Sequence, residues 1–244
     1  MTHAGATAAV GQAIDWQPPA DGLIGRDEEL SRFAAILRRG GPALVLLSGD
    51  IGVGKSNLLL QLRAQVGAQP GGWTIIPSTA SDELSVDAST TEPAFEQRIA
   101  PVTGAGQLIT QSALAQRPAG LAVAYLRGRA PVLLVIDGYR PSGRFAGWFS
   151  ERFVPDVRQA GANVVIVVSA APREAAAVAP LADERIELHP LDPAVVRQHF
   201  TNIGLRLSPP MAAAELDEYV QAACQRSDLI RSLTRVLWLA QLAQ

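Results

Sequence analysis

One short stretch of the chain has the residue types and the spacing of a phosphate-binding cradle. It reads GDIGVGKS, from Gly49 to Ser56, and lies between the apolar run ALVLLS and the helical pattern NLLLQLRAQ. Its glycines let successive backbone N–H groups turn towards a phosphate, and the start of the following helix adds partial positive charge. Lys55 can reach the outer phosphates, and the Ser56 hydroxyl can bind a magnesium ion. The stretch therefore predicts a nucleotide site with Mg²⁺.

Lys55 is also the only lysine in the sequence, because every other long basic side chain is arginine. Arginine carries a planar, forked guanidinium, whereas a phosphate cradle holds a compact ammonium on a flexible stem. A chain that otherwise uses arginine would keep a lysine at a position where arginine cannot replace it. This supports a phosphate-binding role for Lys55.

A nucleotide site of this kind also needs a carboxylate at the end of a neighbouring buried strand, directed at the magnesium. The stretch VLLVIDG, residues 132–138, supplies Asp137 after five apolar residues. The alternative interpretation is an ordinary turn aspartate before Gly138. We favour the metal-binding interpretation because Asp137 occurs together with the cradle.

Hydrolysis requires a further acid to orient the attacking water, commonly a glutamate just after this aspartate. Here the sequence continues with Gly138, Tyr139, Arg140 and Pro141, and the next acid is Glu151. Within the cradle, Asp50 is the nearest substitute, and we expect it on the solvent side of the loop. The residues thus favour nucleotide binding over fast turnover.

Strands and helices alternate around these residues. Buried strands are expected at 43–47, 132–136 and 164–168, with weaker candidates at 73–76 and 185–188. Helical patterns cover 27–39, 55–67, 92–127 with breaks, 144–160 and 173–178, and the polar stretch 78–91 is expected to be an exposed loop. This alternation predicts an α/β fold with a mostly parallel sheet covered on both sides. Together with the cradle it indicates a P-loop NTPase three-layer sandwich.

After Pro190 the pattern changes to three helical segments without a strand, at 192–203, 210–225 and 227–243. We expect a small all-helical subdomain here. The predicted organisation is a flexible lead-in at 1–22, a P-loop core at 23–190 and a helical lid at 191–244.

Composition narrows the function classes. The 244 residues carry a formal net charge of −2, which gives no reason to expect a general nucleic-acid-binding surface. The single cysteine, Cys224, excludes an intrachain disulfide, and the three histidines lack metal-ligand spacing. We see neither a signal peptide nor an apolar run of membrane-spanning length, and expect a cytoplasmic protein.

Taken in order, these motifs resemble the STAND class of AAA+-related signal-transduction ATPases, over residues 22–240. LIGRDEEL, residues 23–30, resembles the segment that precedes the cradle in that class, and origin-recognition AAA+ ATPases share a similar signature. VVIVVSAAPR, residues 164–173, is similar to the strand carrying the sensor residue, and IELHPLDPAVVRQHF, residues 186–200, to the segment leading into the lid.

The resemblance implies ATP or ADP with Mg²⁺ as cofactors and places the LIGR segment against the adenine. It implies that Ser169 lies near the γ-phosphate, and Arg173 falls close to an arginine of the family. The predicted nucleotide-binding residues are Leu23, Ile24, Arg26, Gly49, Asp50, Ile51, Gly52, Val53, Gly54, Lys55, Ser56 and Asn57. The predicted catalytic residues are Lys55, Asp137 and Ser169, with Ser56 and Asp137 as magnesium ligands.

The sequence also departs from the family. Gly138 replaces the second acid, residues 225–228 read QRSD where many relatives have Gly-Gly-x-Pro, and no winged-helix, sensor or effector domain follows. We expect either a fragment or a minimal switch that works with a partner in trans.

Our preferred hypothesis is an ATP-binding regulatory switch that changes conformation or self-associates, with slow or absent hydrolysis. The alternatives are a scaffold that keeps its nucleotide, an AAA+ loader or motor ATPase, and a nucleotide or small-molecule kinase. ATP is favoured over GTP because the Asn-Lys-x-Asp guanine signature is missing.

Overall fold

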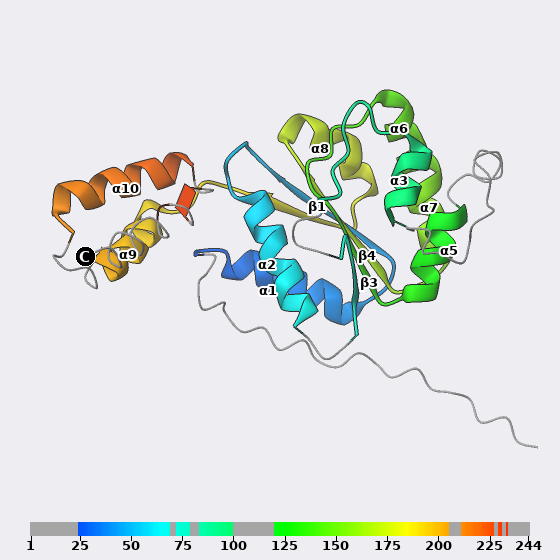
Figure 1. Ribbon diagram of the computed structural model, residues 1–244, viewed down its shortest axis with the longest axis horizontal. Coiled ribbons are helices and arrows are strands. Elements are labelled where there is room, and N and C mark those ends of the chain that lie inside the picture. Colours follow the sequence, from blue (N-terminus) through cyan, green and yellow to red (C-terminus); the bar gives the residue numbers. More distant parts are fainter. Residues whose placement is uncertain are drawn as a thin grey trace, which may run out of the picture.

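A computed structural model of the protein describes residues 24–68, 72–78, 83–99, 120–204, 211–226, 229–230 and 233. Within these residues the centre is a five-stranded sheet in which all neighbouring strands are parallel (Figure 1). The strands are β1 Ala43–Gly49, β2 Thr74–Ile76, β3 Val132–Ile136, β4 Val164–Ala170 and β5 Glu184–Leu188. Their order across the sheet is β2-β3-β4-β1-β5. The predicted α/β fold is confirmed.

The central strands are buried on both faces, and their side chains alternate between two hydrophobic cores. In β4, Ile166 and Val168 belong to one core, whereas Val165 and Val167 belong to the other. Strands covered on both sides read as continuous apolar runs. This is why the sequence shows no polar alternation in β1, β3 and β4.

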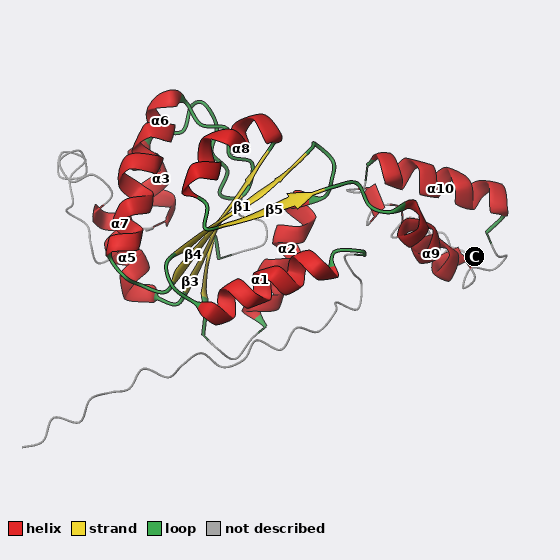
Figure 2. Cartoon of the chain, turned by 180° about the vertical axis from the view of Figure 1, so that it is seen from behind, coloured by secondary structure: helices red, strands yellow, loops and turns green. Residues whose placement is uncertain are grey.

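Helices form a layer on each face of the sheet (Figure 2). One face is covered by α1 Asp27–Arg39 and α2 Lys55–Gly67. The other is covered by α3 Glu92–Ile99, α5 Gly120–Arg129, α6 Gly143–Trp148, α7 Val154–Gln159 and α8 Pro172–Val178. The expected helix at 92–127 is therefore represented by α3 and α5, and its middle lies outside the described residues.

The expected helix at 144–160 is interrupted by a π-helical turn, η1 Phe149–Phe153, between α6 and α7. The wider turn brings together aromatic rings five residues apart, because a π-helix bonds residue i to i+5. Trp148 and Phe153 stack with ring centroids 5.4 Å apart, and Phe95 of α3 meets Phe153 edge-on at 5.5 Å. This aromatic packing holds α3 against the π-turn.

The stretch predicted to be an exposed loop is partly buried. Leu84 and Val86 are 2% and 0% exposed, and Val86 forms a parallel bridge with Tyr139. The backbone N–H of Asp137 donates to the Leu84 carbonyl at 2.9 Å, and that of Arg140 donates to the Val86 carbonyl at 2.6 Å. Residues 83–86 thus extend along the end of β3, and the exposed-loop prediction is wrong there.

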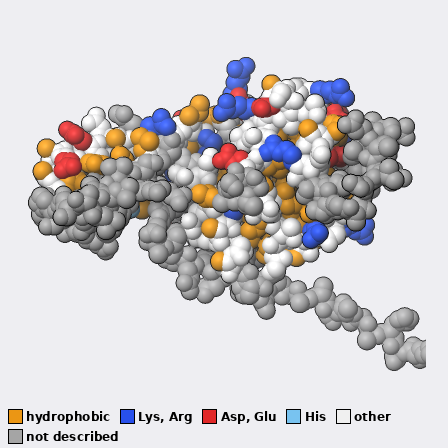
Figure 3. Space-filling model, viewed as in Figure 1, with side chains coloured by type: hydrophobic (Ala, Val, Ile, Leu, Met, Phe, Trp, Pro, Cys, Tyr) orange, Lys and Arg blue, Asp and Glu red, His pale blue; other side chains and the backbone are white. Residues whose placement is uncertain are grey.

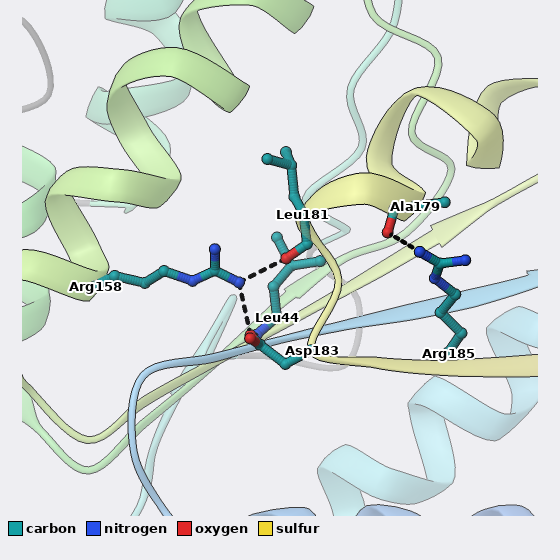
Figure 4. Close-up of polar contacts among 6 residues, drawn as sticks. All are labelled: Leu44, Arg158, Ala179, Leu181, Asp183 and Arg185. Atoms are coloured by element: carbon teal, nitrogen blue, oxygen red, sulfur yellow. Dashed lines mark hydrogen bonds and ion pairs between the residues drawn. The ribbon is translucent and has the colours of Figure 1, made fainter.

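An arginine and an aspartate fasten the beginning of β5 to β1 (Figure 4). Arg158 of α7 donates to the Leu181 carbonyl at 2.6 Å and to Oδ2 of Asp183 at 2.8 Å. The same Asp183 oxygen accepts from the Leu44 N–H at 2.7 Å. Arg185 donates to the Ala179 carbonyl of the short 3₁₀ turn η2, Ala179–Leu181, at 2.6 Å. These bonds thereby fix β1 and β5 at the edge of the sheet opposite the cradle.

Two helices follow β5 and pack mainly on each other. They are α9 Pro193–Gly204 and α10 Ala213–Gln225, close to the expected 192–203 and 210–225. They project from the sheet in Figure 1 and share a hydrophobic cluster that includes Val196, Phe200, Val220 and Ala223. The expected helix at 227–243 lies almost wholly outside the described residues. The proposed domain boundary at residue 190 stays a prediction.

Candidate functional site

The order of the strands gathers the predicted chemical residues at one edge of the sheet. The cradle follows β1 and Asp137 follows β3, and β4 lies between these two strands. In the register, Ser169 of β4 pairs with Leu47 of β1, and Val168 pairs with Ile136, which directly precedes Asp137. Because all three strands are parallel, Ser169 lies between the cradle and Asp137.

The first glycine of the cradle is required by a close backbone approach. A Cβ added to Gly49 would lie 2.6 Å from the Leu188 carbonyl oxygen of β5, and the residue has a φ of +152°. Any side chain here would push β5 away from β1. The loop then turns, and α2 begins at Lys55.

Lys55 folds back onto the loop that carries it. Its ammonium donates to the backbone carbonyls of Gly49 at 2.7 Å and Asp50 at 2.8 Å. Burial lowers the pKa of Lys55 from its ordinary value, and the Asp137 carboxylate acts in the opposite direction. Both hydrogen-bond partners are neutral carbonyls, so the positive charge remains for an anion at the mouth of the cradle.

Asp137 and Ser169 are joined directly. The Ser169 hydroxyl donates to Oδ1 of Asp137 and accepts from the Gly138 N–H at 2.9 Å. The Tyr139 N–H donates to the Ser169 carbonyl at 2.8 Å. Ser169 is fully buried, so it fixes the carboxylate and the backbone that follows β3.

A cavity of about 420 Å³ opens between these elements, within the size range of small-molecule sites. Its lining residues come from the cradle, from the end of β3 and from the end of β4. They are Ile51, Gly52, Gly54, Lys55, Ser56, Asn57, Asp137, Gly138, Tyr139, Arg140, Ser169, Ala170 and Ala171. The structure thus brings the predicted lysine, serine and aspartate together around one space.

A second cavity, of about 140 Å³, adjoins the first and shares Ser56, Asn57 and Asp137 with it. Its remaining lining residues include Glu83, Arg63 and Leu84. Glu83 begins the segment 83–86 that lies along the end of β3, so the docking of that segment places an acid in the lining of the cavity that Asp137 and Ser56 also line.

The remaining residues of the predicted site differ in whether they line the larger cavity. Ile51 is 80% exposed at the rim of the larger cavity, and Asp50 is exposed outside its lining. Val53 is buried in the hydrophobic core beneath α1 and α2 and does not line this cavity. Arg173 is exposed on α8 and lines neither cavity.

The segment predicted to contact adenine is only partly described, since Leu23 lies outside the described residues. Ile24 packs against the hydrophobic cluster of α9 and α10, and the Arg26 side chain bonds to backbone carbonyls of the protein. The predicted contact of this segment with adenine stays a proposal.

Sequence reasoning missed three residues that line the cavities: Glu83, Tyr139 and Arg140. Arg140 is exposed, and its charge acts on Lys55 across the larger cavity. The signal for Glu83 was the alternation of Glu83, Leu84, Ser85 and Val86, which has the period of an extended segment buried on one face. Arg140 carried no signal beyond its closeness to Asp137 in the sequence.

The residues around the larger cavity suit a magnesium-bound nucleotide. Hard oxygen ligands suit Mg²⁺, and the Ser56 hydroxyl and the Asp137 carboxylate supply two beside the Lys55 ammonium. Phosphates would add the rest, as is usual for this ion. The parallel sheet, the strand–cradle–helix unit and the aspartate at the end of β3 together define a P-loop NTPase.

The family model described as AAA ATPase domain matches residues 22–243, and the chain belongs to this family. It is an AAA+-related P-loop ATPase domain. None of the curated proteins compared with the chain matches it.

Among solved structures, the chain is similar to a chain of the E. coli MS115-1 HORMA:CdnC:Trip13 complex, with a TM-score of 0.50 and 17% identity. That match covers 82% of this chain and 73% of the other. A chain of Drosophila ORC bound to DNA matches with a TM-score of 0.45 and 12% identity, covering 85% and 53%. The FIGL-1 AAA domain in complex with ADP matches at 0.38 and 16%, covering 82% and 65%. At 17% identity, the similarity to the chain of the HORMA:CdnC:Trip13 complex supports the fold alone.

On the face shown in Figure 3, the Lys and Arg side chains of the described residues stand in separate groups. None of the described helices has the length and apolar character needed to cross a membrane.

Proposed function

We propose that this chain is a regulatory switch of the STAND type, which binds ATP or ADP with Mg²⁺ and turns over slowly. The observation that carries the proposal is the composition of the larger cavity. Lys55, Ser56, Asp137 and Ser169 supply a binding set, but Gly138 and Arg140 stand where an acid commonly follows the aspartate.

In this proposal each residue has a separate task. The backbone N–H groups of residues 52–56 and the Lys55 ammonium bind phosphate oxygens, and the Ser56 hydroxyl and Asp137 hold Mg²⁺. Ser169 keeps the Asp137 carboxylate in one orientation. Bound Mg²⁺ would neutralise phosphate charge during cleavage of the terminal phosphate.

Arg140 supports tight binding more than fast chemistry. A guanidinium at the rim of the cavity attracts the terminal phosphate, and it cannot accept a proton from water because it stays protonated. Among the described residues that line the two cavities, the acids are Asp137 and Glu83. Glu83 is therefore the candidate for orienting the attacking water.

The output of the switch would be a movement of α9 and α10, followed by self-association or binding of a protein partner in trans. These helices pack mainly with each other, so they can turn as one unit about the connection after β5.

The proposal is tested with purified protein and fluorescent derivatives of ATP and ADP, with light scattering to follow self-association. Binding of both nucleotides, with a larger assembly in ATP than in ADP, would support the switch. Equal assembly in both with permanent nucleotide retention would favour the scaffold hypothesis. Binding of neither nucleotide would contradict the proposal.

A further inference from the structure

A buried arginine joins the phosphate cradle to the start of the helical lid. Arg26 directly precedes α1 and is only 6% exposed. Its Nη2 nitrogen donates to the Val53 carbonyl at 3.0 Å and to the His189 carbonyl at 2.7 Å. Its Nη1 nitrogen pairs with Oε1 of Glu29 at 3.1 Å. One guanidinium nitrogen therefore holds two segments that lie far apart in the sequence.

The first of these contacts sets the direction of a peptide unit in the cradle. The peptide bond between Val53 and Gly54 is trans. In a trans peptide the C=O and the following N–H point in opposite directions. Arg26 draws the Val53 carbonyl to one side, so the Gly54 N–H is turned to the other. Gly54 lines the larger cavity and Val53 does not. Arg26 thus presents the Gly54 N–H to the phosphate position.

The second contact holds the entrance to the lid. His189 follows β5, which ends at Leu188, and α9 begins at Pro193. Its carbonyl belongs to the short connection about which α9 and α10 would turn. A charge-assisted hydrogen bond from a buried guanidinium is roughly twice as strong as a neutral one, so this contact restrains the connection.

The residues just before Arg26 also contact the lid. Gly25 has a φ of +61°, and a Cβ there would lie 3.0 Å from Cγ1 of Val195 and 3.2 Å from Cδ2 of Leu191. Ile24 packs against the hydrophobic cluster of α9 and α10. The segment 24–26 thus contacts the lid through Ile24 and Gly25, and Arg26 is bonded both to the cradle and to the connection that leads into the lid.

We propose that Arg26 is a positioning residue that couples the phosphate cradle to the lid. When a phosphate draws the Gly54 N–H inward, the Val53 carbonyl turns with it, and the shared guanidinium nitrogen shifts relative to the His189 carbonyl. The lid then takes a different orientation in the nucleotide-free and the nucleotide-bound chain. This inference rests on the nucleotide binding proposed above.

Lysine is the informative replacement for Arg26. It keeps the positive charge, but a single ammonium cannot present the planar fork that reaches Val53, His189 and Glu29 together. A matched control is Arg32→Lys, because Arg32 lies on α1 and pairs with Glu184 outside the cradle. Glu29→Gln is a second test variant, since it retains Arg26 and removes the charge that orients it.

The experiment measures the distance between spin labels at Arg38→Cys and Glu218→Cys, both exposed positions, in a Cys224→Ala background. The full chain is compared without nucleotide and with Mg²⁺ plus either ADP or a non-hydrolysable ATP analogue, and affinities for both are titrated. We expect the parent and Arg32→Lys to show a distance shift when either nucleotide binds. Arg26→Lys should lose more than half of that shift and bind about tenfold more weakly, and Glu29→Gln should show a smaller loss of the shift.

The outcomes separate this inference from the proposed function. A parent that binds neither nucleotide contradicts the proposed function and, with it, the coupling. A parent that binds both without a shift, or an Arg26→Lys variant that shifts like the parent, overturns the coupling alone. If Arg26→Lys fails to fold, an undiminished shift in Glu29→Gln overturns the coupling.

Discussion

The Ser169 hydroxyl at the end of β4 donates a hydrogen bond to Oδ1 of Asp137 at the end of β3. Two neighbouring strands thereby share one polar contact at the edge of the sheet where the phosphate cradle lies. The same hydroxyl accepts from the Gly138 N–H, so it orients both the carboxylate and the turn behind it.

Ser169→Ala should destabilise the fold and misplace Asp137. The variant removes a bond to a charged group at a fully buried position and leaves the Gly138 N–H without this acceptor. The expected loss in the free energy of unfolding is about 1.5–3 kcal/mol. Urea unfolding measures it, and Ser169→Thr, which keeps the hydroxyl, is the control. An alanine variant as stable as the parent would contradict this role.

Asp137→Ala should weaken nucleotide binding mainly when magnesium is present. The carboxylate and the Ser56 hydroxyl line the same cavity and are the ligands proposed for Mg²⁺. We expect ATP affinity in Mg²⁺ to fall by about tenfold or more, with a smaller change in EDTA. Titration with a fluorescent ATP derivative under both conditions measures the difference. Equal losses with and without Mg²⁺ would remove Asp137 from the metal site.

Glu83→Gln should slow ATP cleavage without preventing ATP binding. A carboxylate that orients water typically contributes about 10²-fold or more to the rate, whereas the amide keeps the size and loses the charge. Single-turnover hydrolysis and nucleotide titration measure the two effects separately. Glu151→Gln is the matched control, because Glu151 is exposed on the π-turn and lines neither cavity. Equal rates in both variants would exclude Glu83 from the chemistry.

His199 should make the lid sensitive to acid. Burial lowers the pKa of His199 on α9, so the folded state binds its proton less readily than the unfolded state does. Below the ordinary histidine pKa of about 6.5 the unfolded state therefore gains protons first, and the free energy of unfolding decreases as the pH falls. Denaturant unfolding at pH 7.5 and 5.5 tests this, and the pH dependence should be smaller in His199→Gln. A His199→Gln variant whose free energy of unfolding depends on pH as strongly as that of the parent would contradict this prediction.

The sequence was sufficient to predict the parts of the site that follow strand ends. Lys55 and Asp137 each come after a strong apolar run, and parallel strands end at the same edge, so their meeting follows from the α/β alternation. Ser169, which lies within β4, was indicated by the family resemblance alone. The helix at 27–39 could also be predicted from the sequence, because its acids lie in the first turn and its arginines in the last.

The contacts between segments that are distant in the sequence could not be predicted from local sequence patterns. Leu84 and Val86 stand among serines and acids, so the polar composition hid an extended segment that docks on β3. The bonds of Arg26 to Val53 and His189 join segments 27 and 163 residues away in the sequence, which no local pattern encodes. The π-turn at Phe149–Phe153 likewise reflects aromatic packing against α3 rather than helix propensity.

The most direct test of the account is single-turnover ATP hydrolysis by the purified chain, with the bound nucleotide identified before and after the reaction. Lys55→Ala is the comparison, because it removes the ammonium from the cradle and leaves the buried strands intact. We expect the parent to hold ATP and convert it to ADP slowly, over many minutes, and Lys55→Ala to hold neither nucleotide. A parent that binds no ATP, or a Lys55→Ala variant that binds it equally well, would contradict the assignment of this cavity as the nucleotide site.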